Sequence, residues 1–164
     1  MSTEKLEAIP AHQAKLIYRF NQPVNGNSEK LEMGKLALIS SNKNILYSAT
    51  SGLPGFQNLA SATKRGKGRI PTCLQAGLTN YIVDTTPIYL PNTKGVNGNF
   101  YRILPFVVKV GSEQRSDLGI HRDTNVPGSA GCVVITLEDH WRSFEIQMKT
   151  FREQGIIQLP LLVF

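Results

Sequence analysis

"KLALISSNKNILYSA", residues 35–49, places two apolar segments on either side of a polar turn around Asn42 to Asn44. Short runs of aliphatic and aromatic residues joined by a few polar turn-forming residues are typical of a β-hairpin. The preceding segment "KLIYRF", residues 15–20, has the same character and predicts a further strand. The chain is therefore expected to begin as a β-protein.

Further strands are predicted downstream of this hairpin. "YIVDTTPIYLP" (81–91) predicts a strand interrupted at Pro87, and "NFYRILPFVVKV" (99–110) predicts two short strands separated by Pro105, because proline cannot donate to a ladder. "CVVIT" (132–136) predicts another buried strand. The sheet is thus expected to continue through most of the chain.

One helix is predicted, in residues 136–155. Thr136 and Asp139 have capping-box spacing at its start, and Gly155 is a left-handed stop at its end. Large apolar side chains recur at helical spacing and are expected to pack on the sheet: Trp141, Phe144, Met148 and Phe151.

Two other segments complete the predicted fold. Glycine, proline, serine and lysine accumulate in residues 50–72, which predicts a long surface loop. "IIQLPLLVF" (156–164) predicts a buried last strand with Pro160 at an edge or bulge. The predicted fold class is mainly β, a curved sheet or sandwich with one C-terminal helix, and residues 1–164 are expected to form a single domain.

Bulk charge indicates attraction to polyanions, since the formal net charge is +6 and the pI is near 9.5. The basic segment "KRGKGR" (64–69) has no interleaved aromatic residues, so a solvated loop or attraction to cell-wall polymers is preferred to nucleic-acid binding. No apolar run is long enough for a membrane span. The start also lacks a secretory signal pattern, so synthesis without a signal peptide is expected.

The stretch "GIHRDTNVPGSAGCVVI" (119–135) contains the residues that could perform chemistry. A thiol becomes a useful nucleophile beside a base, and imidazole is the common partner. The segment between His121 and Cys132 is rich in Asp, Asn, Pro and Gly, which favour a reversing loop that brings its ends together. Backbone N–H groups near Gly131 and Cys132 could then face a developing oxyanion.

A purely structural role for Cys132 and His121 is also open. A cysteine beside Val-Val-Ile is most often a small core residue, and a single histidine is most often a satisfied polar group. Cys73 has no base beside it in the sequence and is interpreted as structural. His12 and His140 are interpreted as incidental, and Asp123 as a residue that caps its own turn. The histidine and cysteine spacing predicts no metal site, and no cofactor is expected.

The same stretch resembles the active-site signature of the L,D-transpeptidase family, in which a histidine precedes a loop and then Ser-x-Gly-Cys at the head of a strand. The signature falls on His121, Ser129, Gly131 and Cys132. "GKGRIPTC" and "NILYSATSGLPG" resemble upstream segments of the family, and the likeness covers roughly residues 35–135. It implies a cysteine acyl-enzyme mechanism on peptidoglycan stem peptides, with Cys132 as nucleophile and His121 as base and then acid.

The resemblance carries further implications for the site. Ser129 would contact the thiol or the imidazole, and Gly131 would contribute to an oxyanion hole. The arginine that usually follows the Gly-Cys pair is absent here, and Arg122 is the candidate to bind a peptide carboxylate in its place. The loop from His121 to Cys132 is short, which resembles the branch of the family that includes secreted antibacterial effectors.

Several functions remain open at this point. Transfer to an amine gives an L,D-transpeptidase, whereas transfer to water gives an L,D-carboxypeptidase or endopeptidase. The alternative is a non-catalytic cell-wall-binding or phage virion structural domain on the same scaffold. The expected site of action is the periplasm or cell wall, reached through phage lysis or a dedicated export machine.

Overall fold

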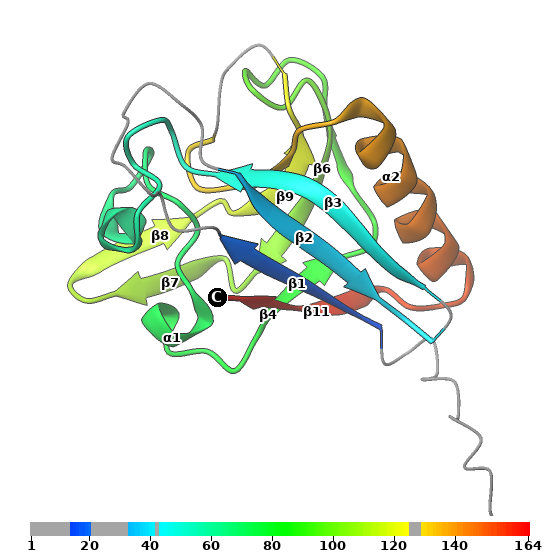
Figure 1. Ribbon diagram of the computed structural model, residues 1–164, viewed down its shortest axis with the longest axis horizontal. Helices are drawn as coiled ribbons and strands as arrows, with labels where there is room; N and C mark the ends of the chain where they lie inside the picture. The colour runs from blue at the N-terminus through cyan, green and yellow to red at the C-terminus, as the bar shows by residue number, and fades with distance from the viewer. Residues whose placement is uncertain (1–13, 21–32, 42, 125–128) are drawn as a thin grey trace, which may run out of the picture.

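The computed structural model describes residues 14–20, 33–41, 43–124 and 129–164. Within these residues strands predominate, and one long helix accompanies them (Figure 1). The strands are β1 (Lys15–Phe20), β2 (Gly34–Ile39), β3 (Asn44–Ser51), β4 (Tyr81–Asp84), β5 (Ile88–Leu90), β6 (Gly98–Leu104), β7 (Val107–Val110), β8 (Glu113–Ser116), β9 (Gly119–Arg122), β10 (Val133–Ile135) and β11 (Gln158–Val163). The helical elements are the 3-10 helix η2 (Leu59–Thr63), the short α1 (Cys73–Ala76) and α2 (Glu138–Glu153).

The described strands form a nine-stranded sheet that closes on itself. Its order is β4-β11-β1-β2-β3-β10-β9-β6-β5, and β4 also pairs with β6. Strand β4 stands at one end of this order, and β6 stands next to the other end. Their pairing closes the sheet into a ring, and β5 lies outside it. Strands β7 and β8 form a separate two-stranded sheet. The predicted class, a mainly β fold with a curved sheet and a helix near the C-terminus, is confirmed.

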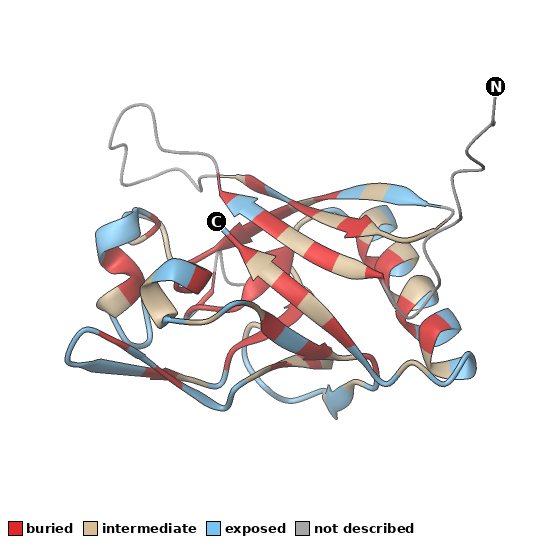
Figure 2. Cartoon of the chain, turned by 90° about the horizontal axis from the view of Figure 1, so that it is seen from below, coloured by how far each residue is buried: buried red, intermediate tan, exposed pale blue. Residues whose placement is uncertain are grey.

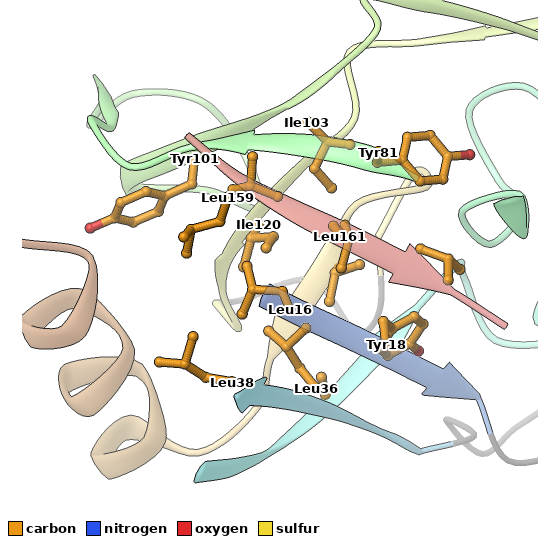
Figure 3. Close-up of a cluster of buried hydrophobic side chains, with 14 of the residues drawn as sticks. Leu16, Tyr18, Leu36, Leu38, Tyr81, Tyr101, Ile103, Ile120, Leu159 and Leu161 are labelled. Atoms are coloured by element: carbon orange, nitrogen blue, oxygen red, sulfur yellow. The ribbon is translucent and has the colours of Figure 1, made fainter. Parts of the chain in front are cut away.

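The core fills the interior of this ring. Strand residues alternate between buried and partly exposed positions, as the colours of Figure 2 show. In Figure 3 the buried side chains of β1, β2 and β11 point toward those of β4, β6 and β9. The cluster includes Leu16, Tyr18, Leu36, Leu38, Tyr81, Tyr101, Ile103, Ile120, Leu159 and Leu161.

Helix α2 adds its apolar face to the same core, which confirms the predicted aromatic stripe. Trp141 and Phe144 both contact the ring of Tyr101, with centroid separations of 5.8 and 5.2 Å. The predicted glycine stop is also present, since Gly155 has φ of +80°. The helix start differs from the capping-box prediction. Leu137 is the N-cap, and the hydroxyl of Thr136 instead bonds to Ser48.

Other predicted elements are confirmed. The hairpin of β2 and β3 is present, with its Asn42 outside the described residues. Pro87 separates β4 from β5, and Pro105 separates β6 from β7. The segment after Gly131 forms the expected buried strand β10.

The last strand was wrongly expected to put Pro160 at an edge or bulge. Strand β11 lies inside the sheet, between β4 and β1. Pairing with β1 begins at Leu161, so Pro160 lies just before that parallel ladder and needs no N–H toward it. Toward β4, Pro160 stands opposite Ile82.

Residues 50–72 were also wrongly expected to be only a surface loop. Ala62 and Ile70 are fully buried, and Arg69 is 2% exposed. The guanidinium of Arg69 stacks over Phe20 at 4.2 Å and donates to the carbonyl of Phe164 at 3.2 Å. Within the basic segment 64–69, residues 64–67 are exposed, whereas Gly68 and Arg69 are buried.

Candidate active site

The register of β9 and β10 determines how His121 and Cys132 are placed. The two strands are parallel, with Ile120 opposite Val133 and His121 opposite Val134. Gly119 and Cys132 are the residues just before this first pair, and the backbone of Gly119 hydrogen-bonds to Cys132. Because side chains alternate between the faces of a strand, Gly119, His121 and Cys132 share one face, and Ile120 and Val133 share the other. The latter two belong to the core, so the histidine and cysteine face outward from the ring.

Both side chains line one pocket of about 590 Å³ on this outer face. The pocket is bounded by β5 and the segment that follows it, by Leu53, and by the loop before β10. Its walls are mainly apolar: Leu53, Leu90, Val96, Phe100, Phe106 and Leu118. A volume of this size is typical of small-molecule pockets, which combine apolar walls with a few convergent polar groups.

His121 is held as a neutral imidazole. It is 4% exposed, and its ring stacks on Phe100 with a centroid separation of 6.1 Å. Burial lowers the pKa of His121, and its hydrogen bond to the carbonyl of Arg122 opposes this shift in part. That bond joins Nδ1 to the carbonyl oxygen at 2.8 Å. Because a carbonyl only accepts, Nδ1 carries the proton, and Nε2 of the neutral ring is left as a base.

Cys132 is held as a neutral thiol. It is 9% exposed, and its Sγ donates to the carbonyl of Asp117 at 3.6 Å. Burial raises the pKa of Cys132 to about 12, although the backbone of Gly119 and the charge of Arg115 act in the opposite direction. Pairing with an imidazole would favour a thiolate in the resting state. The raised pKa of Cys132 indicates a neutral thiol instead. For this thiol to act as a nucleophile, a base would have to remove its proton.

The thiol and the imidazole lie on one pocket wall without a hydrogen bond between them. The bonds they make within the described residues go to backbone atoms, those of Asp117 and Gly119 for the thiol and that of Arg122 for the imidazole. Catalytic hydrogen bonds are often long in unliganded enzymes and tighten when substrate binds. The arrangement thus places a thiol and an imidazole in the same cavity.

Ser129 organises the backbone before the cysteine. Its hydroxyl donates to the carbonyl of Cys132 at 2.5 Å and accepts from the N–H groups of Gly52 and Gly131, both at 3.3 Å. The backbone N–H of Ser129 donates in turn to the carbonyl of Gly52. These bonds commit the hydroxyl to the backbone, so Ser129 acts as a positioning residue. The centre of the loop, residues 125–128, lies outside the described residues.

Gly131 has two structural reasons to be glycine. Its φ is +123°, and a Cβ there would lie 2.2 Å from Nη2 of Arg115. Gly131 does not line the pocket, and its N–H is directed at Ser129. The structure thus places it behind the thiol, where it supports the loop.

Arg115 is a buried cation at the back of the site, 1% exposed. Its guanidinium donates to the carbonyls of Ala62 at 2.5 Å, Gly68 at 2.9 Å, Arg69 at 3.0 Å and Ala130 at 3.3 Å. It therefore ties the buried parts of the 62–69 segment to the loop that carries the cysteine. Burial lowers the pKa of Arg115, and the neighbouring Tyr81 and Cys132 oppose that shift.

The structure directs Arg122 away from the pocket. Its Nη2 donates to the carbonyl of Asn97 at 3.0 Å, and Arg122 is not among the residues that line the cavity. Two other cations, Arg102 and Lys94, line it. Sequence reasoning missed both. The alternation in "NFYRIL" places Phe100 and Arg102 on the opposite face from the core residues Tyr101 and Ile103. No sequence signal marks the β6–β9 register that brings them near Cys132.

Asp117 is a further pocket residue that sequence reasoning missed. Its φ of +57° is uncommon for a residue other than glycine, and its carbonyl accepts from the Cys132 thiol. Such conformations cluster at functional sites. No sequence signal marks it, because aspartate before a leucine is unremarkable in a turn.

Cys73, His140 and Asp123 do not line the pocket. Cys73 lies in the core cluster, where its Sγ accepts from the N–H of Val163 at 3.3 Å, and both cysteines are free thiols. His140 accepts from the N–H of Ser48 at 2.9 Å, so it has a structural contact that the sequence did not predict. Asp123 is half-buried, and burial raises the pKa of its carboxyl group. His12 lies outside the described residues.

Comparisons with known proteins add no family assignment. No protein-family model matches the chain, and neither a curated protein nor a solved structure matches it. Among the described residues, no group of three or more His, Cys, Asp or Glu side chains is placed to hold a metal ion. No helix in the described part of the chain has the length and apolar character needed to cross a membrane. The interpretation of the pocket therefore rests on its own residues.

Proposed function

We propose that this protein is a cysteine-dependent acyl-transfer enzyme that acts on peptidoglycan stem peptides, as an L,D-transpeptidase or an L,D-carboxypeptidase or endopeptidase. The observation that carries the proposal is the pocket shared by a neutral His121 on β9 and Cys132 just before the neighbouring strand β10. The resemblance of the stretch 119–135 to the L,D-transpeptidase signature supplies the substrate class.

The chemistry begins with the thiol. Nε2 of His121 takes the proton of Cys132 while the sulfur forms a bond to the carbonyl carbon and the oxygen takes up the electron pair. When the tetrahedral intermediate collapses, the C–N bond breaks and the leaving amine takes the proton from His121. A thioester on Cys132 remains. Water or a second amine then attacks it, and the thiol leaves with the proton that His121 has taken from the attacking group.

The resting states of both groups suit this sequence of steps. A thiol with a raised pKa needs a general base, and a buried imidazole with a lowered pKa is already in its basic form at neutral pH. Ser129 and Arg115 would hold the backbone around the sulfur while the charge moves. The resting states are therefore consistent with acyl transfer in which His121 activates the Cys132 thiol as a general base. Such transfer does not require a thiolate–imidazolium ion pair before substrate binds.

Purified protein incubated with defined muropeptides tests the proposal, with products identified by mass spectrometry. Dimers or exchanged D-amino acids indicate transfer, and shortened stems indicate hydrolysis. The matched control is Cys73→Ala, which removes the other thiol and should leave the products unchanged. Unchanged stems with the wild-type protein would contradict the enzymatic proposal.

A second candidate is a non-catalytic cell-wall-binding or virion structural domain on the same scaffold. The observation that favours it is the buried, neutral thiol without a hydrogen bond to His121. Under this alternative the protein sediments with purified cell-wall sacculi, and Cys132→Ala binds as tightly as the wild type. Turnover of muropeptides by the wild type would exclude it.

A further inference from the structure

A cation lies in the same cross-strand row as the candidate nucleophile. Arg102 on β6 pairs with Gly119 on β9, and Cys132, the residue just before β10, hydrogen-bonds to the backbone of that same glycine. Arg102 on β6, Gly119 on β9 and Cys132 just before β10 therefore lie in one row across the sheet. All three are on the face that carries the pocket. With strands about 4.8 Å apart, the Cα atoms of Arg102 and Cys132 are about 10 Å apart.

The space between these two side chains has an apolar lining. Gly119 has no side chain, and a Cβ there would lie 2.2 Å from the ring of Phe100. That ring lines the pocket beside His121, and Phe106 lines it beside Arg102. A ligand that reaches from the thiol to the guanidinium would therefore cross an aromatic surface.

The guanidinium of Arg102 retains free binding capacity. Its Nη2 contacts Oδ2 of Asp84 at 3.2 Å, and its Cζ lies over the ring of Phe106, 5.2 Å from the centroid. Its side chain is 41% exposed, against 15% for Asp84. Its Nε is buried without a hydrogen-bond partner among the described residues. A guanidinium has five N–H donors in a planar fork, which matches a carboxylate.

We propose that Arg102 is the specificity-determining residue of the pocket and binds a carboxylate that an apolar spacer separates from the carbonyl attacked by Cys132. The proposal rests on the proposed acyl transfer and specifies its substrate class, acyl donors with a remote carboxylate. Lys94 also lines the pocket and adds positive charge, whereas Asp117 adds negative charge near the thiol. The opposite charges at the two ends orient the carboxylate toward Arg102.

The test uses two thiol-reactive probes of the same length, 6-maleimidohexanoic acid and its neutral amide. Their rates of addition to Cys132 are measured separately by peptide mass spectrometry, with Cys73 quantified in the same digests. We expect the acid-to-amide rate ratio at Cys132 to be about fivefold higher than at a free thiol such as glutathione, which is the contribution of a partly exposed ion pair. The ratio should fall to the glutathione value in Arg102→Met and be retained only in part in Arg102→Lys, which keeps the charge but not the planar fork.

Asp84→Asn separates ligand binding from a structural role of the Arg102–Asp84 pair. The substitution breaks the same ion pair as Arg102→Met, while the amide oxygen can still accept from Gln158. If Arg102 binds the carboxylate, Asp84→Asn frees its guanidinium and raises the ratio. If the pair only supports the fold, both variants lower the ratio together, and the proposal is wrong.

The charge control is Lys109→Met, which removes a positive charge from β7 outside the pocket. An equal loss of preference in Lys109→Met and Arg102→Met would assign the effect to net charge and overturn the proposal, as would loss in Lys94→Met alone. Maleimide addition needs no acyl transfer. A carboxylate preference that depends on Arg102 would therefore support this binding site even if muropeptides were not turned over.

Discussion

Cys132 and Cys73 occupy two regions of the molecule that differ in chemistry although the two residues are almost equally buried, 9% and 8% exposed. Each sulfur contacts backbone atoms, of Asp117 for Cys132 and of Leu161 and Val163 for Cys73. Cys132 faces outward from the sheet into a pocket that it shares with His121. Cys73 begins α1 and packs against β11 in the core.

Burial alone therefore does not distinguish Cys132, the proposed nucleophile, from Cys73, which is interpreted as structural. The distinction lies in which face of the sheet the side chain occupies and in which residue stands on the neighbouring strand. For Cys132, the parallel ladder supplies an imidazole on the same face. For Cys73, strand β11 supplies the carbonyl of Leu161 and the N–H of Val163 as hydrogen-bond partners.

The largest expected effect is on turnover. Cys132→Ala should lower kcat on muropeptides by about 10⁴-fold or more, because it removes the proposed nucleophile. Cys73→Ala should retain wild-type kcat, with a modest loss of stability from the core. Product formation followed by mass spectrometry measures both. Activity that survives in Cys132→Ala and disappears in Cys73→Ala would assign the chemistry to the other thiol.

The pH dependence of alkylation sharpens the same contrast. Burial raises the pKa of Cys132 to about 12, so its thiolate fraction should increase about tenfold per pH unit, or about 1000-fold between pH 7 and pH 10. Iodoacetamide labelling of Cys132 should follow that rise without a plateau. Labelling of Cys73 should stay slower throughout, because its sulfur does not reach the pocket. A plateau for Cys132 near neutral pH would indicate a resting thiolate instead.

His121→Ala should lower kcat/KM by about 100-fold or more through loss of the general base. The pH profile of the wild type carries a second expectation. Burial lowers the pKa of His121, so the imidazole stays neutral below the ordinary histidine range and activity should persist into mildly acidic pH. An acid limb above pH 7 would contradict this. His140→Ala, outside the pocket, is the matched control.

Arg115→Met should destabilise the fold by about 3 kcal/mol, because it leaves buried carbonyl groups without a donor. Arg115→Lys should be less harmful, since it keeps the charge and part of the bonding. Urea unfolding measures the change in the free energy of unfolding. A loss below 0.5 kcal/mol in Arg115→Met would mean that these bonds do not hold the loop.

The smallest effect is expected for Ser129→Ala, about tenfold in kcat, because the hydroxyl positions the backbone of Cys132 and does not contact the thiol. Ser112→Ala, in the exposed turn between β7 and β8, is the control. Steady-state kinetics with both variants measures the difference. A loss as large as that of Cys132→Ala would show a direct catalytic role.

Much of the fold was predictable from local patterns. The β2–β3 hairpin, the breaks at Pro87 and Pro105, and the apolar face of α2 all follow from spacing and from residue type. Strand β9 was not predicted, because its residues are buried on both faces and show no alternation. The interior position of β11 was missed because Pro160 suggested an edge.

The candidate site was predictable only where its residues are close in sequence. His121, Ser129 and Cys132 lie within one short stretch, so their association could be inferred from a turn-rich loop. Arg102 and Phe100 join them only through the β6–β9 register, which sequence alone does not determine. Arg122 follows His121 in sequence but does not line the pocket, because neighbouring residues on a strand point to opposite faces.

Trapping the acyl-enzyme tests the central claim most directly. Wild-type protein mixed with a defined stem peptide is quenched in acid and digested, and the cysteine peptides are weighed by mass spectrometry. We predict a thioester adduct on the Cys132 peptide that forms more slowly in His121→Ala and never appears on Cys73. Products released without any adduct on Cys132, or an adduct on Cys73 instead, would contradict the assignment of Cys132 as the nucleophile.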